Sequence, residues 1–299
     1  MSDQDKIILY DIPSRLTPMA WSPNTWKARY VLNYKRLPYE TVWVSYTEIA
    51  SLWAELGLEP ITDGSIPFTT FLPVISVPPK DGEGARTAIA ESFNIALYLD
   101  RAFPETPRVI PPHTAALHSA FIQALSTAFS APLRPIMIPQ IPLVLADPLG
   151  AAYFTRMREK TFPAPAVTSS AGGSGGVKLA EVSPRGSEKR KADMENAKKA
   201  LQALDRIFKA NQGEQEQGET NKEGKSIDGW IMGSVGPTFA DFAIGAIFRW
   251  IQSVEDVVLV PDGPIGEAEK GELWSLIRSI DEGRWAKYAE RFREWEQVI

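Results

Sequence analysis

One candidate chemical site lies in residues 21–27, which read Trp-Ser-Pro-Asn-Thr-Trp-Lys at the junction of a loop and a predicted helix. Ser22 occupies the N-cap position and Pro23 the first helical position, a pairing that is common at ordinary helix starts. The free N–H groups and the dipole of such a terminus also favour a bound anion, and Asn24 lies in the same predicted turn. The motif therefore allows either a structural cap, the commoner use of this pattern, or an anion-binding hydroxyl.

Two further motifs combine a backbone feature with polar side chains. Leu72 and Pro73 precede a predicted strand, where a proline ordinarily enters an edge strand and a cis peptide bond is a minority form. Glu91 and Ser92 stand where another predicted strand runs into a helix, and helix capping accounts for both side chains. Taken one at a time, neither motif indicates a binding site.

The composition excludes several kinds of chemistry. The chain has no cysteine, so it cannot contain a disulfide scaffold, a cysteine nucleophile or a thiolate metal site. Its two histidines, His113 and His118, lie five residues apart, and neither has the setting of a serine-hydrolase triad. We expect no metal site, and any reaction must use hydroxyls, carboxylates, amines or backbone dipoles.

Charge and hydropathy bear on partners and location. With 32 Lys and Arg against 37 Asp and Glu, the net charge of −5 does not favour a nucleic-acid partner. The longest uncharged apolar region, residues 135–146, is too short to span a bilayer and is interrupted by Pro139 and Pro142. The N-terminal residues lack the pattern of a signal peptide. We therefore expect a cytoplasmic protein with no membrane partner.

Strands and helices alternate over residues 1–103, and they would position the motifs above. Short apolar runs and stripes of helical spacing predict strands at 7–10, 40–44, 74–77 and 87–90 and helices at 23–35, 49–56 and 92–103. This order predicts a small α/β domain whose strand-to-helix junctions carry Ser22 and Glu91.

A second domain is expected after a linker. Residues 104–112 contain four prolines, and strand signals nearly vanish over residues 113–299. Thr238 and Asp241 have the spacing of a capping box before an apolar helical run. The second domain should therefore be all helical.

Three segments of this second domain depart from regular helical patterns. The five prolines of residues 132–148 require a helix there to end or kink. Residues near 163–187 contain no aromatic residue from Pro163 onwards, and residues near 211–226 lack large apolar side chains. We expect both of the latter segments to be flexible insertions.

The order and spacing of these motifs, over nearly the whole chain, resemble the cytosolic glutathione transferases. The resemblance implies the fold of that family, an α/β thioredoxin-like N-terminal domain joined to an all-α C-terminal domain. The family has a thiol-activating residue at the first helix, a cis-proline before the third strand, a Glu/Gln-Ser pair at the third helix and a T-x-x-D capping box. The segment SPNTWKARYVLNYKRLPYETVWV, which starts at Ser22, is most similar to serine-type fungal enzymes related to bacterial β-etherases of lignin breakdown.

The resemblance implies a thiol-activating role for the first motif. Ser22 would donate a hydrogen bond to the sulfur of glutathione, and Asn24 is a secondary candidate near that sulfur. Tyr10 is the rival activator, because tyrosine-type relatives place their phenol near the end of the first strand. We favour Ser22, which lies at the helix start, whereas Tyr10 fits equally well as a core residue of its strand.

The same resemblance implies how glutathione would be held. The backbone of Leu72 would pair with the cysteinyl unit beside cis-Pro73, and Glu91 and Ser92 would hold the γ-glutamyl end. The residue that binds the glycyl carboxylate is not assigned. The available cations are Arg15, Lys27 and Lys35.

Three functions remain open at this point. The first is a glutathione transferase acting on hydrophobic, aromatic electrophiles, with glutathione as cosubstrate and with detoxification or aryl-ether cleavage as its use. The second is a ligandin-like carrier of hydrophobic aromatic compounds, for which the 9 tryptophans and 8 tyrosines would suit stacking. The third is a regulator or scaffold with this fold and no catalysis. A homodimer is expected from the family resemblance.

Overall fold

The N-terminal part of the structure is a four-stranded mixed sheet. Its strand order is β2-β1-β3-β4, with β1 parallel to β2 and antiparallel to β3, and β3 antiparallel to β4. The strands are β1 (Ile7–Asp11), β2 (Tyr39–Trp43), β3 (Val74–Val77) and β4 (Thr87–Ala90). The computed structural model describes residues 6–62, 69–79, 83–162, 177–215, 229–233, 236–255, 257–258, 266–267 and 271–299.

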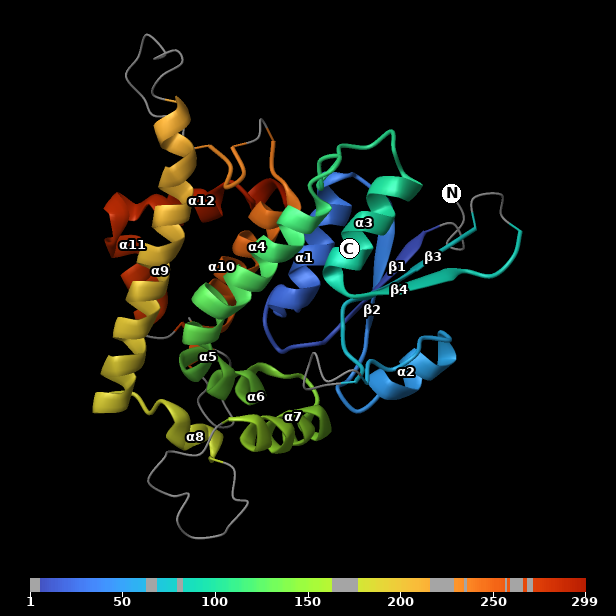
Figure 1. Ribbon diagram of the computed structural model, residues 1–299. Coiled ribbons are helices and arrows are strands. Elements are labelled where there is room, and N and C mark those ends of the chain that lie inside the picture. The colour runs from blue at the N-terminus through green and yellow to red at the C-terminus, as the bar shows by residue number, and fades with distance from the viewer. Residues whose placement is uncertain are drawn as a thin grey trace.

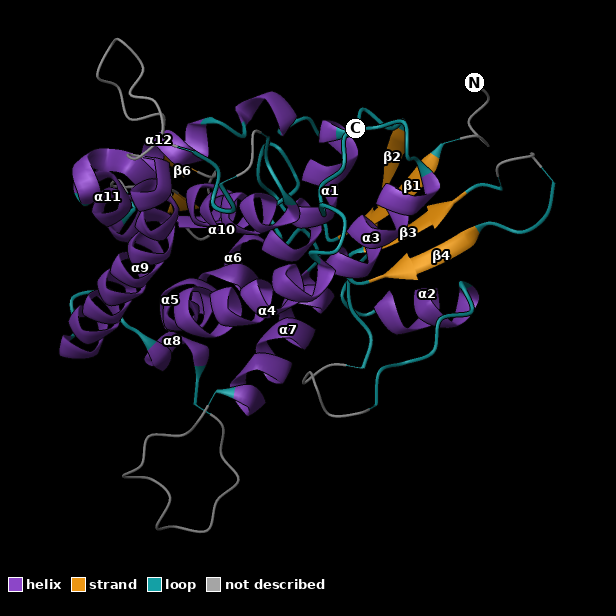
Figure 2. Ribbon diagram, turned by 45° about the horizontal axis from the view of Figure 1, so that its top comes forward, coloured by secondary structure: helices purple, strands orange, loops and turns teal. Residues whose placement is uncertain are grey.

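Three helices flank this sheet. Helices α1 (Pro23–Tyr34) and α3 (Ser92–Ala102) pack together on one face, and α2 (Ile49–Glu55) lies on the other (Figures 1 and 2). Gly57, at φ 67°, follows the end of α2. All seven predicted elements are present, and their ends shift by only one residue, because each depends on a local apolar pattern. The predicted thioredoxin-like fold of the N-terminal part is confirmed.

The described residues that follow α3 are mostly helical. Thr238 immediately precedes α10, and its N–H donates to the Asp241 carboxylate over 2.7 Å, so the predicted capping box is present. The prediction of an all-α second domain is confirmed apart from a two-residue antiparallel pair, β5 (Val257–Val258) and β6 (Gly266–Glu267). The helices are α4 (Ala115–Leu125), α5 (Ala131–Met137), α6 (Ile141–Val144), α7 (Pro148–Thr161), α8 (Leu179–Val182), α9 (Glu188–Gln215), α10 (Phe239–Glu255), α11 (Glu272–Ser279) and α12 (Arg284–Glu290).

The proline-rich segment breaks the helix as expected. A π-helical turn, Ser126–Ser130, joins α4 to α5, and a 3₁₀ turn, Ile138–Gln140, joins α5 to α6. A proline lacks the N–H that an α-helix needs, so the hydrogen-bond pattern changes around each one.

The prediction of two flexible insertions is wrong at their edges. Within the segment near 163–187, α8 begins at Leu179, and Leu179 and Val182 are buried in the core. Two apolar side chains separated by one helical turn are enough to dock this segment, and the lack of aromatics concealed them. Within the segment near 211–226, α9 continues as far as Gln215. Residues 163–176 and 216–228 lie outside the described residues.

The two parts of the chain share an interface built on α1. The Tyr30 ring stacks on Phe242 of α10 at a centroid distance of 5.8 Å and lies 5.4 Å from Phe292. Asn33 donates to the carbonyl groups of Trp295 and Gln297 over 2.7 and 2.9 Å. The C-terminal segment thereby returns to the first domain, as the position of the C label beside α1 and α3 illustrates (Figure 1).

Residues 297–299 continue this contact along β2, the edge strand of the sheet. The Tyr39 hydroxyl donates to the Gln297 carbonyl over 3.3 Å, and the Thr41 hydroxyl donates to the Ile299 carbonyl. We define residues 295–299 as the C-terminal tie. It connects the outer edge of the first domain to the second.

Candidate functional site

Ser22 is the N-cap residue of α1, but its side chain does not act as a cap. Its carbonyl accepts the Trp26 N–H over 2.9 Å, which starts the helix, while its hydroxyl makes no hydrogen bond to the first turn. The side chain is buried, with 5% of the residue exposed. Because the Ser22 side chain makes no cap hydrogen bond, its Oγ atom is available to another partner.

The loop before α1 holds Ser22 in place. Ser14 donates its hydroxyl to the Met19 carbonyl over 2.6 Å, and the Trp26 indole N–H donates to the Ala20 carbonyl over 3.3 Å. Asn24, two residues after Ser22, is exposed at the same helix end. The helix terminus and its two candidate side chains are thus presented by a loop with fixed backbone contacts.

The Leu72–Pro73 peptide bond is cis, as the family resemblance implies. The Pro73 carbonyl accepts the Glu91 N–H over 3.2 Å, which links the start of β3 to the end of β4. Glu91 has φ 75° and ψ 127°, a conformation that non-glycine residues rarely adopt and that an ordinary N-cap does not need. Such strained residues are concentrated at functional sites.

Glu91 and Ser92 form the N-terminal cap of α3. The Glu91 carboxylate accepts from the Ser92 hydroxyl and the Phe93 N–H, each over 3.0 Å, and from the Asn94 N–H over 3.2 Å. The predicted capping role of Glu91 is confirmed. These contacts fix a negative charge and a nearly buried hydroxyl beside cis-Pro73.

The topology brings these residues to one edge of the sheet. Tyr10, near the end of β1, pairs with Val74 at the start of β3, and Val74 pairs with Ala90 at the end of β4. Because β1 and β2 are parallel, the connecting α1 runs back along the sheet, and its N-terminus lies at the end of β1. Ser22, cis-Pro73 and Glu91 therefore share this edge.

Tyr10 faces away from α1. The next residue, Asp11, points toward α1, because its carboxylate accepts from the Arg29 guanidinium over 2.8 Å. Since successive strand residues point to opposite faces, Tyr10 lies on the α2 face. Burial raises the pKa of Tyr10. The positive charge of Arg86 opposes this shift, and the negative charge of Glu55 on α2 adds to it. The phenol is therefore separated from the helix terminus by the sheet.

Two of the three candidate cations already have partners within the protein. Arg15 donates to the Leu143 carbonyl over 2.6 Å, and Lys35, at the far end of α1, is buried in an ion pair of 2.7 Å with Asp100. Burial lowers the pKa of Lys27, and the nearby Glu91 carboxylate opposes that shift. Lys27 therefore lies within electrostatic range of the α3 cap.

Sequence patterns do not indicate that the segment from α6 to α7 borders this region. The Arg15 N–H donates to the Val144 carbonyl over 2.8 Å, and the Ser45 hydroxyl donates to the Asp147 carboxylate over 2.5 Å. Asp147 followed by proline is a recognisable helix start, but its partner Ser45 is 102 residues away. This segment covers the loops that follow β1 and β2.

Among the residues described, no group of three or more His, Cys, Asp or Glu is arranged to hold a metal ion. None of the described helices combines the length and apolar character needed to cross a bilayer.

Family models and solved structures match both halves of the chain. The glutathione S-transferase N-terminal domain matches residues 21–102, and the glutathione S-transferase C-terminal domain matches residues 116–295. A glutathione S-transferase of Ceriporiopsis subvermispora, CsGST63524, solved in complex with glutathione, is 36% identical. It has a TM-score of 0.77, with 98% of this chain and 99% of that chain covered.

Two further fungal proteins that are similar to this chain carry names of the same family. The glutathione transferase GSTFuA3 from Phanerochaete chrysosporium is 31% identical, with a TM-score of 0.75 and 98% of each chain covered. A glutathione S-transferase-like protein of Aspergillus flavus, UstS, is 27% identical over 98% of this chain and 96% of its own length. The relation to β-etherases stays a prediction. Since the family models span most of the chain and these fungal relatives align over nearly all of it, the protein belongs to the glutathione S-transferase family.

Proposed function

We propose that the protein is a glutathione transferase in which the Ser22 hydroxyl stabilises the thiolate of bound glutathione. The observation that carries this proposal is that Ser22 lies at the N-terminus of α1 with its hydroxyl unused as a cap. The glutathione complex of the Ceriporiopsis relative supports glutathione as the cosubstrate. The position of Tyr10 on the opposite face of the sheet supports Ser22 over its rival.

The Ser22 hydroxyl and the N-terminus of α1 together can stabilise the thiolate enough that no general base from the protein is required. A free thiol has a pKa near ~8.5, and lowering it by about two units requires roughly 2.7 kcal/mol of selective stabilisation. A hydrogen bond to a charged group contributes roughly 1.5–3 kcal/mol, and a helix N-terminus adds roughly 0.3–1 kcal/mol. The thiol proton passes to water, the thiolate sulfur bonds to the electrophilic carbon, and the leaving group departs with its electron pair.

The other residues of the edge would orient the tripeptide. The Leu72 backbone pairs with the cysteinyl unit beside cis-Pro73, and Glu91 and Ser92 hold the γ-glutamyl end. Lys27, whose pKa responds to the charge of Glu91, is a candidate cation for the γ-glutamyl end. Asn24 is an exposed secondary residue near the sulfur. Hydrophobic aromatic electrophiles are the proposed second substrate.

Glutathione titration and a turnover assay with an activated aryl halide test this proposal. We expect saturable glutathione binding by calorimetry and conjugation that requires glutathione. Binding of aromatic compounds with quenching of tryptophan fluorescence, but without turnover, would instead identify a ligandin-like carrier. A protein that does not bind glutathione would have to be a scaffold or regulator of the same fold.

We further propose that the protein forms a homodimer through α4. Residues 109–133 contain no charged side chain, and α4 leaves Leu117 61% exposed on a face of small residues. An uncharged exposed face of this kind marks an interaction surface.

We expect light scattering to give the mass of a dimer for the native protein and of a monomer for Leu117→Glu, because burying the new carboxylate opposes association. Leu149→Glu, on the exposed start of α7, is the matched control and should leave the mass unchanged. A native monomer at micromolar concentration, or a Leu117→Glu dimer, would contradict this interface.

A further inference from the structure

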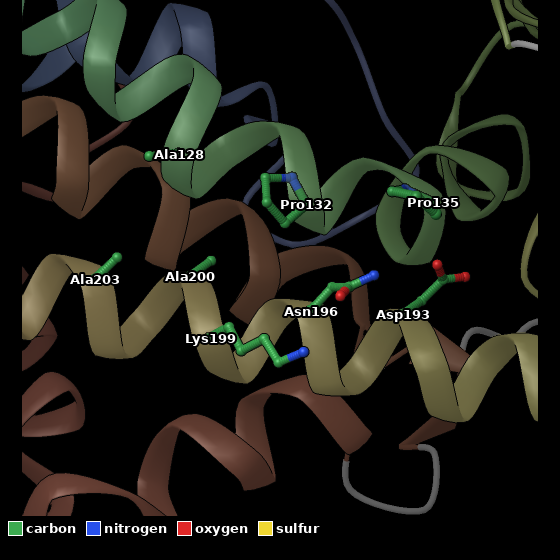
Figure 3. Close-up of a pocket in the computed structure, with 8 residues that line it drawn as sticks. All are labelled: Ala128, Pro132, Pro135, Asp193, Asn196, Lys199, Ala200 and Ala203. Carbon is green, nitrogen blue, oxygen red and sulfur yellow. The ribbon is translucent and has the colours of Figure 1, made fainter.

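A groove of about 330 Å³ lies between α9 and the segment formed by the π-helical turn and α5 (Figure 3). This volume is at the lower end of the range for small-molecule sites, roughly 300–1,000 Å³. None of the lining residues comes from the N-terminal sheet or its helices. The residues that line it are Ala128, Pro132, Pro135, Asp193, Asn196, Lys199, Ala200 and Ala203.

Asp193 contributes an unpaired acceptor to this groove. Its Oδ2 atom is buried and has no hydrogen-bond partner within the described part of the chain. Arg190, one turn earlier on α9, pairs with Glu272 through its Nε over 2.7 Å, while its Nη2 lies 3.8 Å from Glu255 and makes no hydrogen bond within the described residues. A buried acceptor without a donor is unfavourable and uncommon in folded proteins, so this oxygen requires an explanation.

The opposite wall adds apolar surface without backbone donors. Pro132 and Pro135 have no N–H, and the carbonyl of Ala128, four residues before Pro132, therefore loses the donor that an α-helix would supply. Figure 3 shows the Asp193 carboxylate extending from α9 toward the Pro135 side of the groove. The groove thus combines a negative charge with apolar rings.

We propose that this groove binds a small organic ammonium ion, an amine with a compact apolar body. The ammonium group donates to Asp193 Oδ2, and the apolar body lies against the rings of Pro132 and Pro135 and the methyl group of Ala200. Lys199 lies six residues from Asp193 along the helix, about 9 Å away at the rise of an α-helix. Because Lys199 also lines the groove, its positive charge repels a bound cation and weakens its binding.

Benzylammonium is a suitable probe, with benzyl alcohol and benzoate as neutral and anionic analogues of similar shape. We expect calorimetry or ligand-observed NMR to show benzylammonium binding at least fivefold more tightly than either analogue. Asp193→Asn should abolish this preference, whereas Lys199→Gln should strengthen ammonium binding about twofold. Glu195→Gln, which removes an exposed acidic side chain from the same helix, should leave it unchanged.

The variants also separate binding from folding. Because no described residue donates a hydrogen bond to Asp193 Oδ2, Asp193→Asn should not lower the melting temperature. Ala203→Met, which fills the groove, should remove benzylammonium binding while leaving glutathione conjugation intact. Tighter binding of benzoate or benzyl alcohol, an ammonium preference that survives in Asp193→Asn, or the absence of benzylammonium binding would each overturn the proposal.

Discussion

Ser22→Ala is expected to lower turnover about tenfold or more and to raise the pKa of the bound glutathione thiol by about one unit or more. The reason is the loss of one hydrogen bond to the thiolate. A tenfold change in rate corresponds to ~1.4 kcal/mol of lost stabilisation. Stopped-flow or steady-state rates with an activated aryl halide, and the ultraviolet absorbance of the thiolate as a function of pH, measure the two effects. Ser22→Thr keeps a hydroxyl and should retain part of the activity.

The same variant has an informative effect on stability. Replacing a serine that caps a helix usually destabilises a protein by ~1 kcal/mol, but the Ser22 hydroxyl makes no capping bond. We therefore expect urea unfolding of Ser22→Ala to match that of the native protein while activity is lost. Tyr10→Phe should keep its activity. Normal turnover in Ser22→Ala together with an inactive Tyr10→Phe would reject Ser22 as the activating residue.

Asp241→Asn is expected to reduce the free energy of unfolding by about 3 kcal/mol or more. Asp241 is fully buried, and its carboxylate accepts four hydrogen bonds. One oxygen accepts from the Ile231 N–H over 2.7 Å and from the Tyr288 hydroxyl, and the other accepts from the N–H and hydroxyl of Thr238 over 2.7 and 2.8 Å. An asparagine presents an NH₂ group to two of these donors and leaves them unpaired.

Urea unfolding followed by tryptophan fluorescence measures this loss. Asp241→Ala should be at least as destabilising, because all four donors then lose their partner. Glu195→Gln, an exposed acidic residue on α9, is the matched control and should change the unfolding free energy by less than about 0.5 kcal/mol. If Asp241→Asn is as stable as the native protein, the Asp241 network does not hold α10 to the segment around Ile231.

The alternation of elements in the first domain is predictable because it depends on neighbours in sequence. Strand β3 and helix α1 are recognisable from runs of apolar residues and from Ser22 and Pro23 at a helix start. The direction of the Ser22 hydroxyl is not predictable in this way. The sequence pattern favours a cap, and the structure has the cap position without the cap hydrogen bond.

The other features that sequence patterns do not indicate depend on contacts between residues that are far apart in the chain. Lys35 is an available cation by its type, yet the packing of residues 100–107 against α1 makes it a buried structural partner of Asp100. Helix α8 has too few apolar residues to be recognised, and its burial depends on the surface formed by other helices. The docking of Ser45 on Asp147 likewise requires the assembled second domain.

The C-terminal tie has a consequence for how the chain folds during synthesis. Residues 1–103 emerge from the ribosome first, but the carbonyl groups that accept hydrogen bonds from Asn33, Tyr39 and Thr41 arrive only with residues 295–299. At about 5–20 residues per second, the interval is roughly 10–40 s. During that time the aromatic face of α1 around Tyr30 remains uncovered, and apolar surface exposed in this way makes incompletely folded chains prone to aggregation. Translation speed across the second domain therefore sets how long the first domain is exposed to aggregation.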